Sequence, residues 1–136
     1  MANTTFSGPV RSENGFESIT KNGTTGAITT NATYNGTITG GVQEITGAGA
    51  ADLTNLITEM DSTGGAVAVT LANGSTAGQI KIVTMVVDGG DITFTPATFA
   101  NGTNITFADA GDTVTLVWAN TIGWTVVSNS GATVNA

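Results

Sequence analysis

Regularly spaced strand-like runs constrain the fold of this chain more than any other feature of its sequence. Between residues 66 and 127, six short runs rich in Val, Ile, Thr and aromatic residues follow one another. They are residues 66–71, 79–87, 91–95, 104–107, 113–118 and 123–127. Turn-forming pairs such as Asn73-Gly74 and Asn101-Gly102 separate them. Short strands alternating with turns are typical of antiparallel sandwiches, barrels and rolls, so we predict an all-β, antiparallel sandwich or barrel-like domain.

Composition agrees with this prediction. The 136 residues include 27 Thr, 19 Gly and 12 Asn, which disfavour helices, and the 40% hydrophobic content is sufficient for a core. Residues 80–87 are apolar on both faces except for Lys81 and Thr84, which predicts a central strand. Pro96 cannot donate a backbone hydrogen bond, so we expect the strand that ends near it to lie at a sheet edge or in a loop.

The three segments before residue 66 have weaker secondary-structure signals. Leu53, Leu56, Ile57 and Met60 have the spacing of a helix face, with Asp52 as a possible N-cap, but interleaved Thr residues favour a strand equally. Residues 47–52 read as a loop. Weak alternation on both sides of Asn35-Gly36 predicts a small hairpin. The recurrence of Ile-Thr-Phe at 92–94 and 105–107 is treated as a coincidence rather than a solenoid repeat.

The first 25 residues differ in charge from the remainder. They contain two of the three basic residues and two acidic residues, whereas residues 26–136 contain eight acidic residues and Lys81 alone. We interpret residues 1–25 as an extended arm and residues 26–136 as the β-rich domain; a first core strand is the alternative for the arm. Its candidate anchoring residues for a partner are Phe6, Pro9, Val10, Arg11 and Phe16.

The absent residue types exclude most chemistry. There is no His and no Cys, so Ser-His and Cys-His catalysis, imidazole acid-base chemistry and nitrogen- or sulfur-ligated metal sites are excluded. The formal charge of −7 argues against binding to nucleic acid or to an anionic membrane. We therefore expect no enzyme activity, no catalytic residue, no cofactor and no metal site. The N-terminus lacks a signal-peptide pattern, so we expect synthesis in a cytoplasm.

Two groups of residues, the clustered aspartates and the large aromatic residues, each have a functional and a structural interpretation. Asp88/Asp91 and Asp109/Asp112 form two Asp-x-Gly-Asp tetrads that suit Ca²⁺, but aspartates that hydrogen-bond their own turns are the more common case. Trp118 and Trp124, with Tyr34, are the aromatic residues large enough to stack on a sugar. A Trp pair across a hairpin is more often part of the core, and we predict this role for Trp118 and Trp124.

Several motifs carry a resemblance to a known group of proteins. Residues 6–16 (FSGPVRSENGF) resemble the N-terminal motif of small virion structural proteins of tailed bacteriophages, especially marine ones. The downstream matches are 71–74 (LANG), 78–81 (GQIK), 86–91 (VVDGGD), 93–96 (TFTP), 105–107 (ITF), 111–116 (GDTVTL), Trp124 and 129–134 (NSGATV). The resemblance covers most of the chain apart from residues 25–50, and it favours strand over helix at 53–60.

This resemblance implies a capsid decoration (cement) protein, a homotrimer on the exterior of the phage head. Its partner would be the major capsid protein, whose contacts it would stabilise, with the N-terminal arm as the attachment segment. An acidic β domain suits the outer surface because packaged DNA would repel it. A trimer would turn weak contacts into tight attachment. The alternative is a tail or head-fibre knob that binds a host-surface glycan through Trp118 or Trp124.

Overall fold

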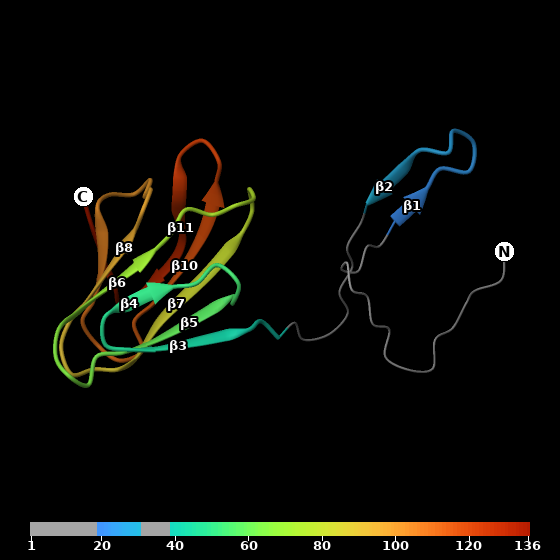
Figure 1. The fold of residues 1–136 in the computed structure, drawn as a ribbon. Coiled ribbons are helices and arrows are strands. Elements are labelled where there is room, and N and C mark those ends of the chain that lie inside the picture. Colours follow the sequence, from blue (N-terminus) through green and yellow to red (C-terminus); the bar gives the residue numbers. More distant parts are fainter. Residues whose placement is uncertain (1–18, 31–38) are drawn as a thin grey trace, which may run out of the picture. The chain divides into compact units, whose positions relative to one another are not determined.

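The computed structural model describes residues 19–30 and 39–136, and the chain divides into two compact units, Met1–Ile38 and Thr39–Ala136. In the first unit, strands β1 (Ile19–Lys21) and β2 (Ile28–Thr30) form an antiparallel hairpin (Figure 1). The side chain of Asn22 closes its turn by accepting hydrogen bonds from the backbone N–H groups of Thr24 and Thr25. The predicted turn at Asn35-Gly36 lies outside the described residues.

The second unit is a sandwich of two five-stranded sheets. One sheet, called here the β7 sheet, has the strand order β11-β10-β7-β5-β3, and the other, the β8 sheet, has the order β12-β9-β8-β6-β4. The strands are β3 (Val42–Thr46), β4 (Gly49–Ala51), β5 (Ile57–Asp61), β6 (Val67–Leu71), β7 (Ile80–Val87), β8 (Ile92–Pro96), β9 (Asn104–Phe107), β10 (Thr113–Ala119), β11 (Gly123–Ser130) and β12 (Thr133–Asn135). The prediction of an all-β fold is confirmed.

The prediction of purely antiparallel sheets is wrong. From β3 to β8 the chain changes sheet at every strand, as Figure 1 lets the reader follow. A chain that crosses to the other sheet and returns runs in its original direction, so β3, β5 and β7 pair in parallel, and so do β4, β6 and β8. The later strands pair antiparallel, in the hairpins β8-β9 and β10-β11 and in the pairs β7-β10 and β9-β12.

The individual strands agree closely with the sequence pattern. Each of the six predicted runs overlaps one strand from β6 to β11, and β7 is the middle strand of its sheet, as predicted. The ambiguous segment 53–60 is a bend followed by strand β5, without a helix. The predicted loop at 47–52 contains strand β4, because Ala51 is buried and pairs with Leu71 of β6.

The expectation for Pro96 is also wrong, because β8 is the central strand of its sheet. Pro96 is its last residue, opposite Leu71 of β6. The antiparallel pairing with β9 has already ended at Phe94. The missing N–H group therefore interrupts no pairing with β9, which explains how a proline fits at the end of a central strand.

A single core fills the space between the two sheets. Its fully buried members include Met60, Val83 and Leu116 from the β7 sheet, and Phe94 and Ile105 from the β8 sheet. Phe94 also packs edge-on against Phe107, with ring centroids 6.2 Å apart. The two Ile-Thr-Phe segments lie on the adjacent strands β8 and β9, paired antiparallel from Ile92–Phe107 to Phe94–Ile105. Their recurrence reflects two strands that contribute to the same core in opposite directions.

Candidate functional site

A buried lysine lies at the centre of the largest polar network in the described residues. Strand β7 directs Lys81, Val83 and Met85 inward, and Lys81 is only 1% exposed. Its ammonium group donates a hydrogen bond of 2.8 Å to the backbone carbonyl of Asn55 and lies 3.8 Å from Oδ1 of Asp52. Burying a charge is costly unless it finds such partners, so these contacts compensate its lost hydration.

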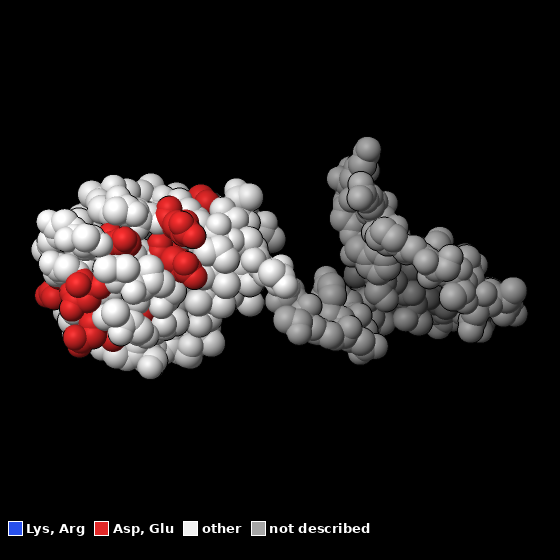
Figure 2. Space-filling view, turned by 90° about the horizontal axis from the view of Figure 1, so that it is seen from below, with Lys and Arg blue, Asp and Glu red and all other residues white. Residues whose placement is uncertain are grey.

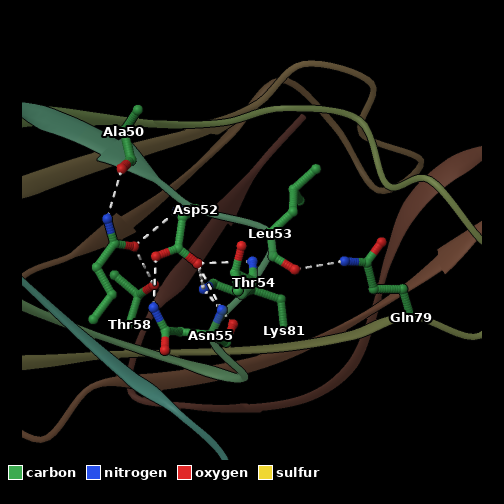
Figure 3. A network of polar contacts seen from close by, with 9 residues as sticks. Ala50, Asp52, Leu53, Thr54, Asn55, Thr58, Gln79 and Lys81 are labelled. Carbon is green, nitrogen blue, oxygen red and sulfur yellow. Dashed lines mark hydrogen bonds and ion pairs between the residues drawn. The ribbon is translucent and has the colours of Figure 1, made fainter. Parts of the chain in front are cut away.

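The partners of Lys81 come from the bend between β4 and β5 (Figure 3). Asp52 organises this bend. Its Oδ1 accepts hydrogen bonds from the backbone N–H groups of Thr54 (2.9 Å) and Asn55 (2.7 Å), and its Oδ2 accepts one from the side-chain amide of Asn55 (2.7 Å). The carboxylate thus fixes the bend in the conformation that presents the Asn55 carbonyl to Lys81.

Two glutamines extend this network, and Figure 3 labels one of them, Gln79. Gln43 of β3 donates to the Ala50 carbonyl and accepts hydrogen bonds from the Asp52 N–H and the Thr58 hydroxyl. Gln79, just before β7, donates to the Leu53 carbonyl at 2.9 Å. Together these side chains connect β3, β5 and β7 of one sheet with the end of β4 of the other, so the network joins the two sheets.

The electrostatics of the pair follow from its surroundings. Burial lowers the pKa of Lys81, and the attraction of Asp52 offsets part of this effect. The pKa of Asp52 is lowered, first by the hydrogen bond from the Asn55 backbone and then by that from the Asn55 side chain. Asp52 is 34% exposed and Lys81 2% by side chain, so the network holds the fold together and does not offer Lys81 to a ligand.

The aspartate tetrads occupy turns. Oδ1 of Asp88 accepts a hydrogen bond from the Gly90 N–H, and Oδ2 of Asp112 accepts hydrogen bonds from the N–H groups of Ala108 and Asp109. These bonds match the predicted turn-forming role. Among residues 19–30 and 39–136, no group of three or more acidic side chains is arranged to hold a metal ion.

The two tryptophans belong to the core. Trp118 and Trp124 are opposite each other on β10 and β11, with ring centroids 5.5 Å apart, and are 8% and 0% exposed. The indole N–H of Trp124 donates to the Ala72 carbonyl, and that of Trp118 donates to the Asn120 side chain. Neither indole presents a ring face on which a sugar could stack. Tyr34 lies outside the described residues.

The outer face of the β7 sheet carries a different set of side chains. Val42, Ile57, Ile82 and Thr115 are neighbours across β3, β5, β7 and β10, and Ile80 is beside Val117 on the same face. The outward position of these residues follows from the inward position of Lys81, Val83 and Met85, because side chains alternate along a strand. Val42 is 48% exposed and Ile80 is 50% exposed.

The predicted arm residues, Phe6, Pro9, Val10, Arg11 and Phe16, lie outside the described residues. In the part of the chain that is described, no helix is long and apolar enough to cross a membrane.

Sequence reasoning missed both Lys81 and the outer apolar face. The sequence contained the signal for Lys81. Side chains alternate along a strand, so Lys81 lies on the same face of β7 as Val83 and Met85 and is buried with them. The outer face was missed because the apolar residues on both faces of 80–87 were interpreted only as the sign of a central strand.

Comparisons with known proteins add no assignment. No protein-family model matches the chain, and no curated protein matches it.

Proposed function

We propose that this chain is a structural protein of a phage virion, a capsid decoration protein that binds the outside of the head and stabilises contacts between major capsid proteins. The observation that carries the proposal is the charge distribution of the sandwich. Residues 39–136 contain eight acidic residues and a single basic residue, Lys81, which is buried. The sandwich therefore exposes only negative charge, as expected of a protein that faces solvent rather than packaged DNA.

The polar groups of the described residues support a structural role. Lys81, Asp52, Asp88 and Asp112 all form hydrogen bonds within the fold. The proposal retains the N-terminal arm, residues 1–25, as an attachment segment with Phe6, Arg11 and Phe16 as anchors. It also retains a homotrimer, because three linked contacts raise the effective affinity for a symmetric shell.

Titration of purified protein onto isolated heads of the phage that encodes it tests the proposal. We expect saturable binding with a copy number set by the symmetry of the shell, measured by gel densitometry and by electron microscopy of the decorated particles. Absence of binding, or a handful of copies at one vertex, would contradict capsid decoration.

A variant that lacks residues 2–20 tests the arm separately. The deletion also removes two of the three residues of β1, so we expect the sandwich, residues 39–136, to remain folded, by circular dichroism, and the protein to lose binding to the heads. Full occupancy by this truncated protein would reject the arm as the attachment segment. The glycan-binding alternative receives no support from Trp118 and Trp124, because both indoles are enclosed in the core.

A further inference from the structure

The two outer faces of the sandwich have different chemical character. On the β8 sheet, the residues that point outward are short and uncharged: Ala68, Thr70, Thr93, Thr95, Asn104, Thr106, Thr133 and Asn135. On the β7 sheet, the outward residues include four large aliphatic side chains near the centre: Ile57, Ile80, Ile82 and Val117. Packing of the core does not depend on the outward residues of either sheet. The difference between the two faces therefore reflects the surroundings of each face, solvent or a partner.

The aliphatic side chains of the β7 sheet form a continuous surface. Val42, Ile57 and Ile82 are adjacent across β3, β5 and β7, and Ile80 and Val117 are adjacent across β7 and β10. Of the six large hydrophobic side chains that are exposed among the described residues, five come from strands of this sheet: Val42, Ile80, Val86, Val87 and Val127. A contiguous exposed apolar patch on a soluble domain marks an interaction surface.

Acidic residues border this apolar surface. Glu44 of β3 and Glu59 of β5 are direct neighbours in the parallel register, one step along from Val42 and Ile57 on the same face. Like charges in such positions repel each other. Within residues 39–136 the one basic residue, Lys81, is buried against Asn55 and Asp52, so the sandwich supplies no cation to this pair. Figure 2 shows acidic groups on one face of the sandwich and no basic group there among the described residues.

We propose that the outer face of the β7 sheet is a docking surface for a protein whose contact region presents aliphatic side chains bordered by Lys or Arg. The aliphatic part of the partner would cover Val42, Ile80 and their neighbours, and its cations would relieve the repulsion between Glu44 and Glu59. A second copy of the sandwich is a poor occupant, because it would bring further carboxylates and no exposed cation. The inference rests on the proposed function, in which the partner is the major capsid protein.

Two matched double variants of the full chain test this surface in the head-binding titration. Val42→Lys/Ile80→Lys adds two cations to the β7 face, and Thr95→Lys/Thr133→Lys adds the same two to the β8 face, in both cases on strands that are not neighbours. We expect the first variant to bind heads at least about tenfold more weakly, as for the loss of a buried anchor, and the second to bind like the unmodified protein. Thermal melts check that both remain folded, which is expected because all four positions point outward.

A third variant, Glu44→Gln/Glu59→Gln, tests the charge complementarity without adding bulk. Binding of the unmodified protein should weaken as NaCl is raised, and this variant should show a smaller salt dependence. Equal binding by all variants, with the unmodified protein bound, would overturn the docking surface and leave capsid decoration intact. Failure of the unmodified protein to bind would reject the proposed function and this inference with it. Conversion of an oligomer to monomers by Val42→Lys/Ile80→Lys in sedimentation would identify a second copy as the occupant and overturn the assignment to a basic partner.

Discussion

The β7 sheet and the β8 sheet share one core, but their outer faces carry different kinds of side chain. On the β8 sheet, Asn135 donates hydrogen bonds to Asn104 and to Thr106, so the outward polar groups satisfy one another across strands. On the β7 sheet, aliphatic side chains are exposed to solvent, and two neighbouring glutamates have no cation beside them in the sandwich. The inward residues of both sheets therefore determine how the chain folds, whereas the outward residues of the β7 sheet form the surface that we propose for a partner.

The largest effect should come from the core that both sheets share. We expect Trp124→Ala in the β7 sheet and Phe94→Ala in the β8 sheet each to lower the free energy of unfolding by about 3–5 kcal/mol, because both side chains are fully buried. Chemical denaturation measures both values.

The two variants serve as controls for each other. Similar losses and a single cooperative transition are expected if the sheets form one folding unit. A large loss for one variant with a small loss for the other would show that the two sheets are stabilised independently.

The second prediction concerns the buried lysine, which has no counterpart in the described part of the β8 sheet. Replacing Lys81 by Met keeps the aliphatic volume but leaves the Asn55 carbonyl without its partner, and we expect a loss of about 1–3 kcal/mol in the free energy of unfolding.

A double-mutant cycle with Asp52→Asn separates the hydrogen bond from the ion pair. Because Asp52 is 34% exposed and 3.8 Å from the ammonium group, we expect a coupling energy below about 1 kcal/mol. A coupling as large as the whole effect of Lys81→Met would mean that the ion pair, and not the hydrogen bond to Asn55, stabilises the network.

These residues also show how far the sequence could predict the molecule. Short runs of Val, Ile, Thr and aromatic residues, separated by turn residues, identified the strands from β6 to β11. It could not assign strands to sheets, since a turn such as Asp88-Gly89-Gly90-Asp91 looks the same whether it closes a hairpin or crosses between sheets. Strand β4 was missed because Gly49, Ala50 and Ala51 have low strand propensity, and tertiary pairing with β6 overrides that propensity.

The same limit applies to the candidate sites. The turn role of Asp88 and Asp112 and the core role of the two tryptophans follow from local patterns, and both predictions are confirmed. The network of Gln43, Asp52 and Lys81 depends on contacts between residues far apart in the sequence, which a local pattern does not contain.

The third prediction is a smaller, pH-dependent contribution from Asp52. Its pKa is lower in the folded protein than its ordinary value of 3.8, so the unfolded chain binds the proton more tightly. The stability from this carboxylate is therefore present above pH 3.8 and is lost as the pH falls through the lower folded-state pKa. Urea denaturation at a series of acidic pH values should show a shallower loss of stability for Asp52→Asn than for the unmodified protein.

Asp61 also has a lowered pKa, caused by hydrogen bonds from Thr63, and it remains in the Asp52→Asn variant. Part of the acid-induced loss should therefore persist. Identical acid profiles for the variant and the unmodified protein would show that the protonation of Asp52 is not linked to folding.

The smallest expected effect comes from the repulsion between Glu44 and Glu59, which has no counterpart on the outer face of the β8 sheet. Glu59→Gln removes one of two neighbouring carboxylates and should raise the free energy of unfolding by about 0.2–1 kcal/mol at low salt. Glu44→Gln should give a similar gain, and the double variant should gain little more, because either substitution alone already abolishes the repulsion. Addition of NaCl should shrink all three gains, since salt screens charges on an exposed face. Gains in the free energy of unfolding that simply add, or that persist at high salt, would mean that the two glutamates act independently. A basic partner would then relieve no repulsion between them on the β7 face.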